Sequence, residues 1–182
     1  MRLSGRVQRI QPSVTLAVAA RARALQLQGR DIISFGVGEP DFDTPAHIQA
    51  AAAAAMAQGA GKYTAVAGIA ELRAAAAAEL SAVHDLKLGP ENILVSTGAK
   101  HSIYNLLMAL RDDGDEVIVP TPCWPSHVEL VRMAGGVPVL AEQRSEDGFQ
   151  LDPELLGRLL TKRTRALMLN SPSNPTGAVY NE

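Results

Sequence analysis

The sequence predicts an α/β protein in which helices cover both faces of a mostly parallel sheet. Beyond residue 90, short apolar runs alternate with segments whose apolar residues recur at helical spacing, the pattern of βαβ units. Turns rich in glycine, proline and aspartate separate these segments. With 182 residues, 47% of them hydrophobic, the chain is long enough for one domain with a substantial core.

Start and stop signals set the boundaries of the expected elements. Gly29 and Gly59 end two helices, and Thr44 is expected to cap a helix with Pro45 at its first position. In chain order, the sequence predicts helix 14–27, strand 31–35, helix 45–58, helix 69–83, strand 93–96, helix 99–111, strand 116–119, helix 126–134, strand 137–140, a helix that starts at 152–154, and strand 166–169.

The turn over residues 96–99, Ser-Thr-Gly-Ala, is the first candidate site. It carries two hydroxyls, a glycine that lets a ligand approach the backbone, and the free N–H groups of the helix that follows. Such a turn favours an anion, so it is a candidate phosphate site. The alternative is an ordinary strand-to-helix turn in which Thr97 only caps the helix.

Three loops are expected to follow the carboxyl ends of strands, where open α/β sheets bind their ligands. They supply an anion-binding turn at 96–100, the only tryptophan of the chain, Trp124, and an amide, Asn174, held between prolines. A flat, phosphorylated ligand that forms hydrogen bonds would use all three. A further loop, 36–43, either brings backbone close to a ligand or is a plain turn. In the loop 62–68, Tyr63 is either a ligand group or a packed aromatic.

Composition excludes several classes of function. The net charge of −2 gives no basic surface for nucleic acid, and no apolar run is long enough to span a membrane. The N-terminus does not form a signal peptide, so we expect a cytoplasmic protein. A single cysteine, Cys123, allows no internal disulfide and no metal-ligand cluster.

Five motifs resemble, in order and spacing, those of the class I aminotransferases among the fold-type I pyridoxal phosphate enzymes. They are GEPDFDTP at 38–45, KYTAVAG at 62–68, STGAK at 96–100, GDEVIVPTPCW at 114–124 and SPSNPTGAVY at 171–180. The likeness is strongest to the bacterial aspartate and prephenate aminotransferases. It implies a three-layer α/β/α large domain, incomplete in this chain, over residues 45–182, and an N-terminal arm with part of the small domain over 1–44.

The resemblance also implies roles for individual residues around pyridoxal 5′-phosphate. Backbone N–H groups of Gly98, Ala99 and Lys100 would hold the phosphate, with Ser96 and Thr97 as lesser candidates. Trp124 would stack on the ring, Asn174 would donate to the ring hydroxyl oxygen, and both would border the substrate. Tyr63 would reach the phosphate of a neighbouring subunit in a homodimer.

Substrate residues follow from the same likeness. Gly38 would offer its backbone to the substrate carboxylate, and Thr15 with Lys100 would meet the distal carboxylate of aspartate or glutamate. The alternatives are a helix cap for Thr15 and a solvated lysine for Lys100. Cys123 stands where close relatives carry tyrosine, which bears on substrate specificity. Cis peptide bonds are implied at Thr121-Pro122 and Asn174-Pro175.

The lysine that forms a Schiff base with the cofactor is expected to be missing. Lys62, Lys87, Lys100 and Lys162 all lie in contexts unlike the SxSK segment of the family. The sequence therefore predicts the N-terminal part of a longer transaminase, inactive by itself and exposing an open sheet edge. Other interpretations are a C–S lyase acting with the same cofactor, a non-catalytic regulatory module, or an unrelated phosphate-binding α/β enzyme.

Overall fold

The computed structural model describes residues 2–180 and, for Arg6, the backbone only. The chain forms two compact units, residues 1–13 with 97–182 and residues 14–96. The domain boundary at residue 44, which the family resemblance implies, does not coincide with these units and stays a prediction.

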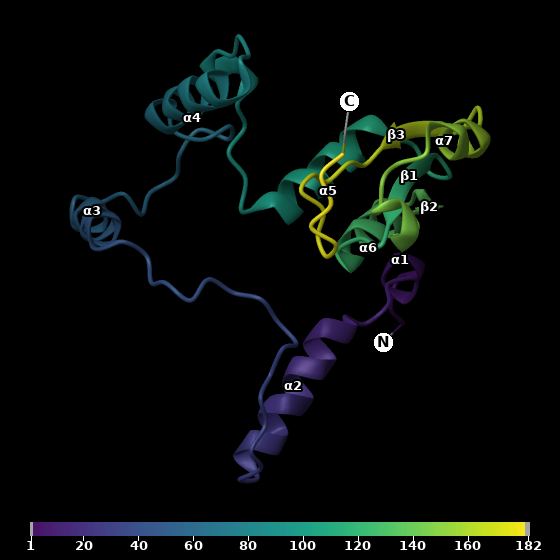
Figure 1. The fold of residues 1–182 in the computed structure, drawn as a ribbon. Coiled ribbons are helices and arrows are strands. Elements are labelled where there is room, and N and C mark those ends of the chain that lie inside the picture. Colours follow the sequence, from purple (N-terminus) through teal and green to yellow (C-terminus); the bar gives the residue numbers. More distant parts are fainter. Residues whose placement is uncertain (1, 181–182) are drawn as a thin grey trace. The chain divides into compact units, whose positions relative to one another are not determined.

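The unit of residues 14–96 consists of helices joined by extended segments (Figure 1). Its elements are α2 (Val14–Leu27), α3 (Ala46–Ala57), α4 (Ala70–His84) and the 3-10 turn η1 (Pro90–Asn92). The predicted helices are thus confirmed. Thr44 does not cap α3, because Pro45 is the N-cap residue and no side chain bonds to this helix end.

The prediction of strands at 31–35 and 93–96 is wrong. Both segments are extended but pair with no strand among the described residues. Ile33 and Phe35 are largely exposed, and the Val95 N–H donates one isolated bond to the Ala67 carbonyl at 2.9 Å. An apolar, β-branched run favours a strand, but only a hydrogen-bonded neighbour makes it one.

The unit of residues 1–13 and 97–182 contains a parallel three-stranded sheet in the order β2-β1-β3 (Figure 1). Its elements are α1 (Gly5–Gln8), α5 (Ala99–Leu110), β1 (Glu116–Thr121), α6 (Pro125–Ala134), β2 (Val137–Glu142), η2 (Ser145–Asp147), α7 (Pro153–Leu159) and β3 (Thr164–Leu167). The predicted parallel α/β architecture is confirmed, with β3 beginning two residues earlier than expected.

The core lies between β1 and the pair α5 and α6. It is formed by Leu107, Val117, Val119, Leu130, Val131 and Ala134. Because side chains alternate along a strand, Ile118 points to the opposite face of the sheet, and it too is buried. The right-handed crossover rule places α7, which packs against β2, on that second face. The central strand is therefore buried on both faces.

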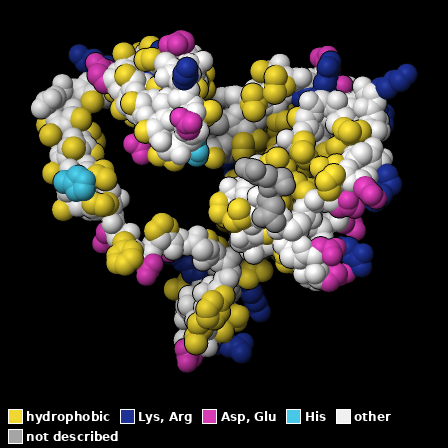
Figure 2. Space-filling model, turned by 45° about the horizontal axis from the view of Figure 1, so that its top comes forward, with side chains coloured by type: hydrophobic (Ala, Val, Ile, Leu, Met, Phe, Trp, Pro, Cys, Tyr) yellow, Lys and Arg dark blue, Asp and Glu magenta, His cyan; other side chains and the backbone are white. Residues whose placement is uncertain are grey.

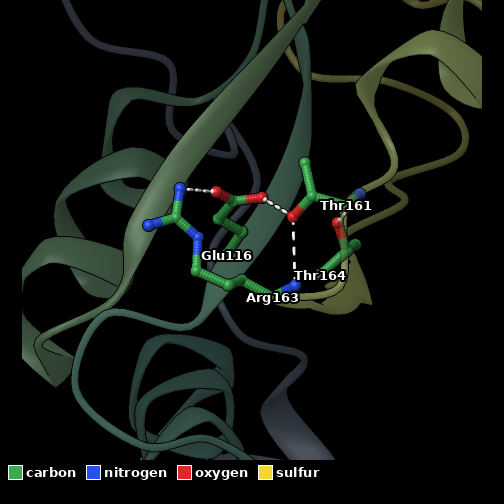
Figure 3. Close-up of polar contacts among 4 residues, drawn as sticks. All are labelled: Glu116, Thr161, Arg163 and Thr164. Atoms are coloured by element: carbon green, nitrogen blue, oxygen red, sulfur yellow. Dashed lines mark hydrogen bonds and ion pairs between the residues drawn. The ribbon is translucent and has the colours of Figure 1, made fainter.

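The amino end of β1 is fixed by a buried carboxylate (Figure 3). Glu116 is 4% exposed; it accepts a hydrogen bond from the Thr161 hydroxyl at 2.6 Å and forms an ion pair with Arg163 at 2.5 Å. The Thr161 hydroxyl bond lowers the pKa of Glu116, and the Arg163 guanidinium lowers it further. This contact ties the loop before β3 to the start of β1, at the end of the sheet opposite the candidate site.

Many hydrophobic side chains are exposed in both units (Figure 2). Phe35, Phe42 and Tyr63 belong to one unit, and Leu106 and Leu110 on α5 belong to the other. No helix within residues 2–180 has both the length and the apolar character that crossing a membrane requires.

Candidate functional site

The turn that begins α5 has free backbone donors. Its N-cap residue is Gly98, at φ 79°, and no side chain caps the helix. Thr97 is therefore not the cap; its own N–H donates to Nδ1 of His101 at 3.2 Å. The N–H groups of Ala99 and Lys100, in the first turn, have no partner within the helix.

Gly98 suits an approaching ligand for two reasons. A positive φ is strained for residues that carry a Cβ. A Cβ built at Gly98 would meet no atom within 4 Å, so the space in front of the turn is open. In the unit of residues 14–96, the hydroxyl of Ser96 is buried and lacks a hydrogen-bond partner among the described residues.

Trp124 joins this turn to the loop that follows β1. It is half-buried and is the N-cap residue of α6, with Pro125 at the first helical position. The ammonium of Lys100 lies 4.8 Å from the centre of the Trp124 ring. This cation–π contact brings two of the predicted site residues together at the carboxyl end of β1.

The loop that carries Asn174 crosses the same edge of the sheet. It begins where the Met168 N–H donates to the Ile118 carbonyl beside β1, and it ends where Tyr180 bonds to Gln143 at 3.2 Å, just after β2. Because β1 lies between β2 and β3, the loop passes the carboxyl end of β1. Asn174 itself is exposed and makes no hydrogen bond to Trp124 or Gly98 in the described structure.

This loop is shaped by its own backbone. The Ser173 N–H donates to the Ala178 carbonyl at 2.8 Å, and the Gly177 N–H donates to the Ser173 carbonyl at 2.7 Å. The peptide bonds Thr121-Pro122 and Asn174-Pro175 are cis, which confirms both predictions, and Ser171-Pro172 is a third, unpredicted one.

Three predicted site residues belong to the unit of residues 14–96. Tyr63 is fully exposed, so it is not the packed loop aromatic of the alternative interpretation. Gly38 lies in an exposed extended segment with open space where a Cβ would be. Thr15 is the second residue of α2 and is exposed, inside the helix rather than at its cap.

Two histidines near the turn and the ring were missed from the sequence. His101 accepts the Thr97 N–H, and His127 packs edge-on against Trp124 with ring centres 5.5 Å apart. The spacing of three residues between Trp124 and His127 at a helix start was the available signal. Burial lowers the pKa of His127 and raises the pKa of the Cys123 thiol, which therefore stays protonated at neutral pH.

The donor set fits a flat, phosphorylated ligand. An uncapped helix start provides backbone donors for phosphate, Trp124 provides a stacking surface, and the crossing loop provides an amide. The described residues contain no group of His, Cys, Asp or Glu able to hold a metal ion. Fold and site thus define an α/β protein with an uncapped helix start beside an aromatic ring.

Comparison with known proteins identifies the family. The sequence model for aminotransferase class I and II matches residues 30–182, and the chain belongs to this family. It is 51% identical to the aspartate/prephenate aminotransferase of Thermus thermophilus over 98% of this chain and 46% of that protein. It is 46% identical to the aspartate aminotransferase of Bacillus subtilis over 100% of this chain and 46% of that protein.

Solved structures agree with this assignment. The aspartate aminotransferase from Thermus thermophilus with maleate matches with a TM-score of 0.95 at 51% identity, over 100% of this chain and 48% of that one. The enzyme from Rhizobium meliloti matches with a TM-score of 0.94 at 42% identity, over 100% of this chain and 45% of that one. The chain spans about half the length of the relatives it matches.

Proposed function

We propose that this chain is the N-terminal part of a pyridoxal phosphate-dependent aminotransferase that exchanges an amino group between aspartate or glutamate and a 2-oxo acid. The observation that carries the proposal is the contact between Lys100 and Trp124. It joins the uncapped turn of α5 to the aromatic ring after β1, so one ligand can reach both. Family membership supplies the reaction class.

The cofactor would be held by groups at the carboxyl edge of the sheet. Backbone N–H groups of Gly98, Ala99 and Lys100 would bind its phosphate at the start of α5. Trp124 would stack on its ring, and the amide of Asn174 would donate to the ring hydroxyl oxygen. When bound, the cofactor acts as an electron sink that makes the α-proton of the amino acid acidic.

Substrate selection would rest on Lys100 with Thr15 and Gly38. Lys100 forms no ion pair with a described carboxylate, so its charge is available for the distal carboxylate of a dicarboxylic substrate. The similar aspartate aminotransferase from Thermus thermophilus was solved with maleate, which is itself a dicarboxylate. Gly38 would bind the α-carboxylate through its backbone.

The complete enzyme would be a homodimer. Tyr63 is fully exposed and lies beside Lys62 in the loop between α3 and α4. A fully exposed phenol is suited to reach the phosphate bound by a second copy. A cytoplasmic location and the division into residues 1–44 and 45–182 belong to the same proposal.

The Schiff-base lysine would lie in the part of the enzyme beyond this chain, so the 182 residues would be inactive alone. The test is borohydride reduction in the presence of pyridoxal phosphate, followed by peptide mass spectrometry. The longer protein should retain the cofactor on one lysine outside residues 1–182. A single specific adduct on Lys62, Lys87, Lys100 or Lys162 would contradict the proposal.

A keto-acid panel with the longer protein then tests the reaction itself. Transfer from aspartate to 2-oxoglutarate is the expected activity. Elimination of sulfur from cysteine conjugates without amino transfer would show a lyase instead.

A further inference from the structure

His127 lies edge-on against the Trp124 ring. The two ring centres are 5.5 Å apart and the planes meet at 85°, a T-shaped contact. Both residues belong to the start of α6, where the His127 N–H donates to the Trp124 carbonyl at 2.9 Å. His127 is 6% exposed, whereas Trp124 is only half-buried. The imidazole is therefore the better fixed of the two rings.

The helix that carries His127 is anchored to the sheet. Leu130, Val131 and Ala134 of α6 are buried in the core with β1. Lys100, the other neighbour of the Trp124 ring, is an exposed side chain on a flexible stem. Of His127 and Lys100, only His127 belongs to a helix segment that the core holds.

Packing, rather than hydrogen bonding, accounts for the contact in the described structure. The imidazole nitrogens of His127 form no hydrogen bond with any described residue. The side chain also borders a cavity of about 310 Å³ whose lining includes Arg111 and Arg165. Burial lowers the pKa of His127, which favours the neutral ring.

We propose that His127 is a positioning residue that fixes the plane of the Trp124 ring for stacking on the cofactor. This deepens the proposed function and rests on it. A ring already held in the stacking orientation loses less side-chain freedom when the cofactor binds. Loss of the edge contact should therefore weaken cofactor affinity roughly 2- to 13-fold, the effect of ordering one more side chain.

The first test needs no activity and no cofactor. The longer protein is labelled with 5-fluorotryptophan, and the Trp124 signal is the fluorine resonance that W124F removes. Three variants are compared: H127A removes the ring, H127L keeps similar bulk without it, and H127F keeps an aromatic edge. H84A, at the exposed end of α4, is the matched control.

The expected result is a Trp124 resonance that narrows and moves toward free fluorotryptophan in H127A and H127L but stays near its native position in H127F. In the native protein the Trp124 resonance should follow the protonation of His127, with a midpoint below 6.5. Arg111 and Arg165 line the same cavity as His127, and Lys100 lies over the Trp124 ring; these positive charges face the imidazole. This titration should vanish in H127F and persist in H84A.

Cofactor affinity is measured separately by equilibrium titration of the same proteins. H127A and H127L should lose affinity and H127F should retain it. An unchanged resonance in H127L, or an equal loss in H127F and H127L, would overturn the proposal. If neither the native protein nor any variant binds the cofactor but the resonances behave as expected, the proposed function fails and the positioning of Trp124 stands.

Discussion

Replacement of Leu107 by alanine tests whether the core fixes α5, the helix that begins at the uncapped Gly98 turn. Leu107 is 5% exposed and packs with Val117, Val119 and Leu130 between α5 and the sheet. Truncation of a buried leucine removes its transfer free energy and leaves a cavity, at a cost of about 2–5 kcal/mol. Local stability around β1 should fall by that amount.

The matched control is Met108→Ala, one residue further along α5. Met108 is 45% exposed and lies outside the core cluster, so the same truncation should change stability by less than about 1 kcal/mol. The helical propensity of alanine is favourable in both variants, which leaves burial as the difference between them.

The assay is native-state hydrogen exchange of the β1 amides in the longer protein, because its domains need not unfold in one step. The opening free energy of residues 117–119 should drop in Leu107→Ala and stay near the native value in Met108→Ala. Equal losses in the two variants, or a loss below about 1 kcal/mol for Leu107→Ala, would refute the packing argument.

Three further predictions concern the site and the sheet. Trp124→Leu should weaken cofactor binding by at least the aromatic contribution, roughly 2- to 13-fold, as measured by equilibrium titration; unchanged affinity would exclude stacking. Lys100→Ala should raise KM for aspartate roughly tenfold or more but leave KM for an aromatic amino acid nearly unchanged, whereas parallel changes would assign Lys100 to the phosphate alone. The Thr161 hydroxyl is the largest cause of the lowered pKa of Glu116. The ionised Glu116 therefore stabilises the fold fully at pH values above the ordinary pKa near 4.5, and this stabilisation is lost as pH falls through the lower pKa of the folded state. Thr161→Val should therefore flatten the acid side of the stability profile, and an identical acid profile in native and variant protein would count against this role.

The sequence predicted most of the fold because its signals are local. Helical periodicity and capping residues defined α2, α4 and α6, and short apolar runs marked β1 and β2 within two residues of their observed ends. The run 93–96 has the same apolar character as β1, yet it is not a strand. A β-strand needs a hydrogen-bonded partner strand from a distant part of the sequence, and a local apolar pattern does not specify that partner.

For the candidate site too, local sequence signals predicted some features and long-range packing decided others. The motifs placed Gly98 and Trp124 in turns, since small residues and prolines act on the backbone beside them. The apposition of Lys100 and Trp124 arises only when α5 and α6 pack on one face of β1, whereas His127 meets Trp124 within the start of α6 itself. Sequence alone thus determined which chemical groups this chain offers and in which turns they lie. Tertiary structure decided which of them meet, because contacts between distant residues are set by the burial of shared apolar faces.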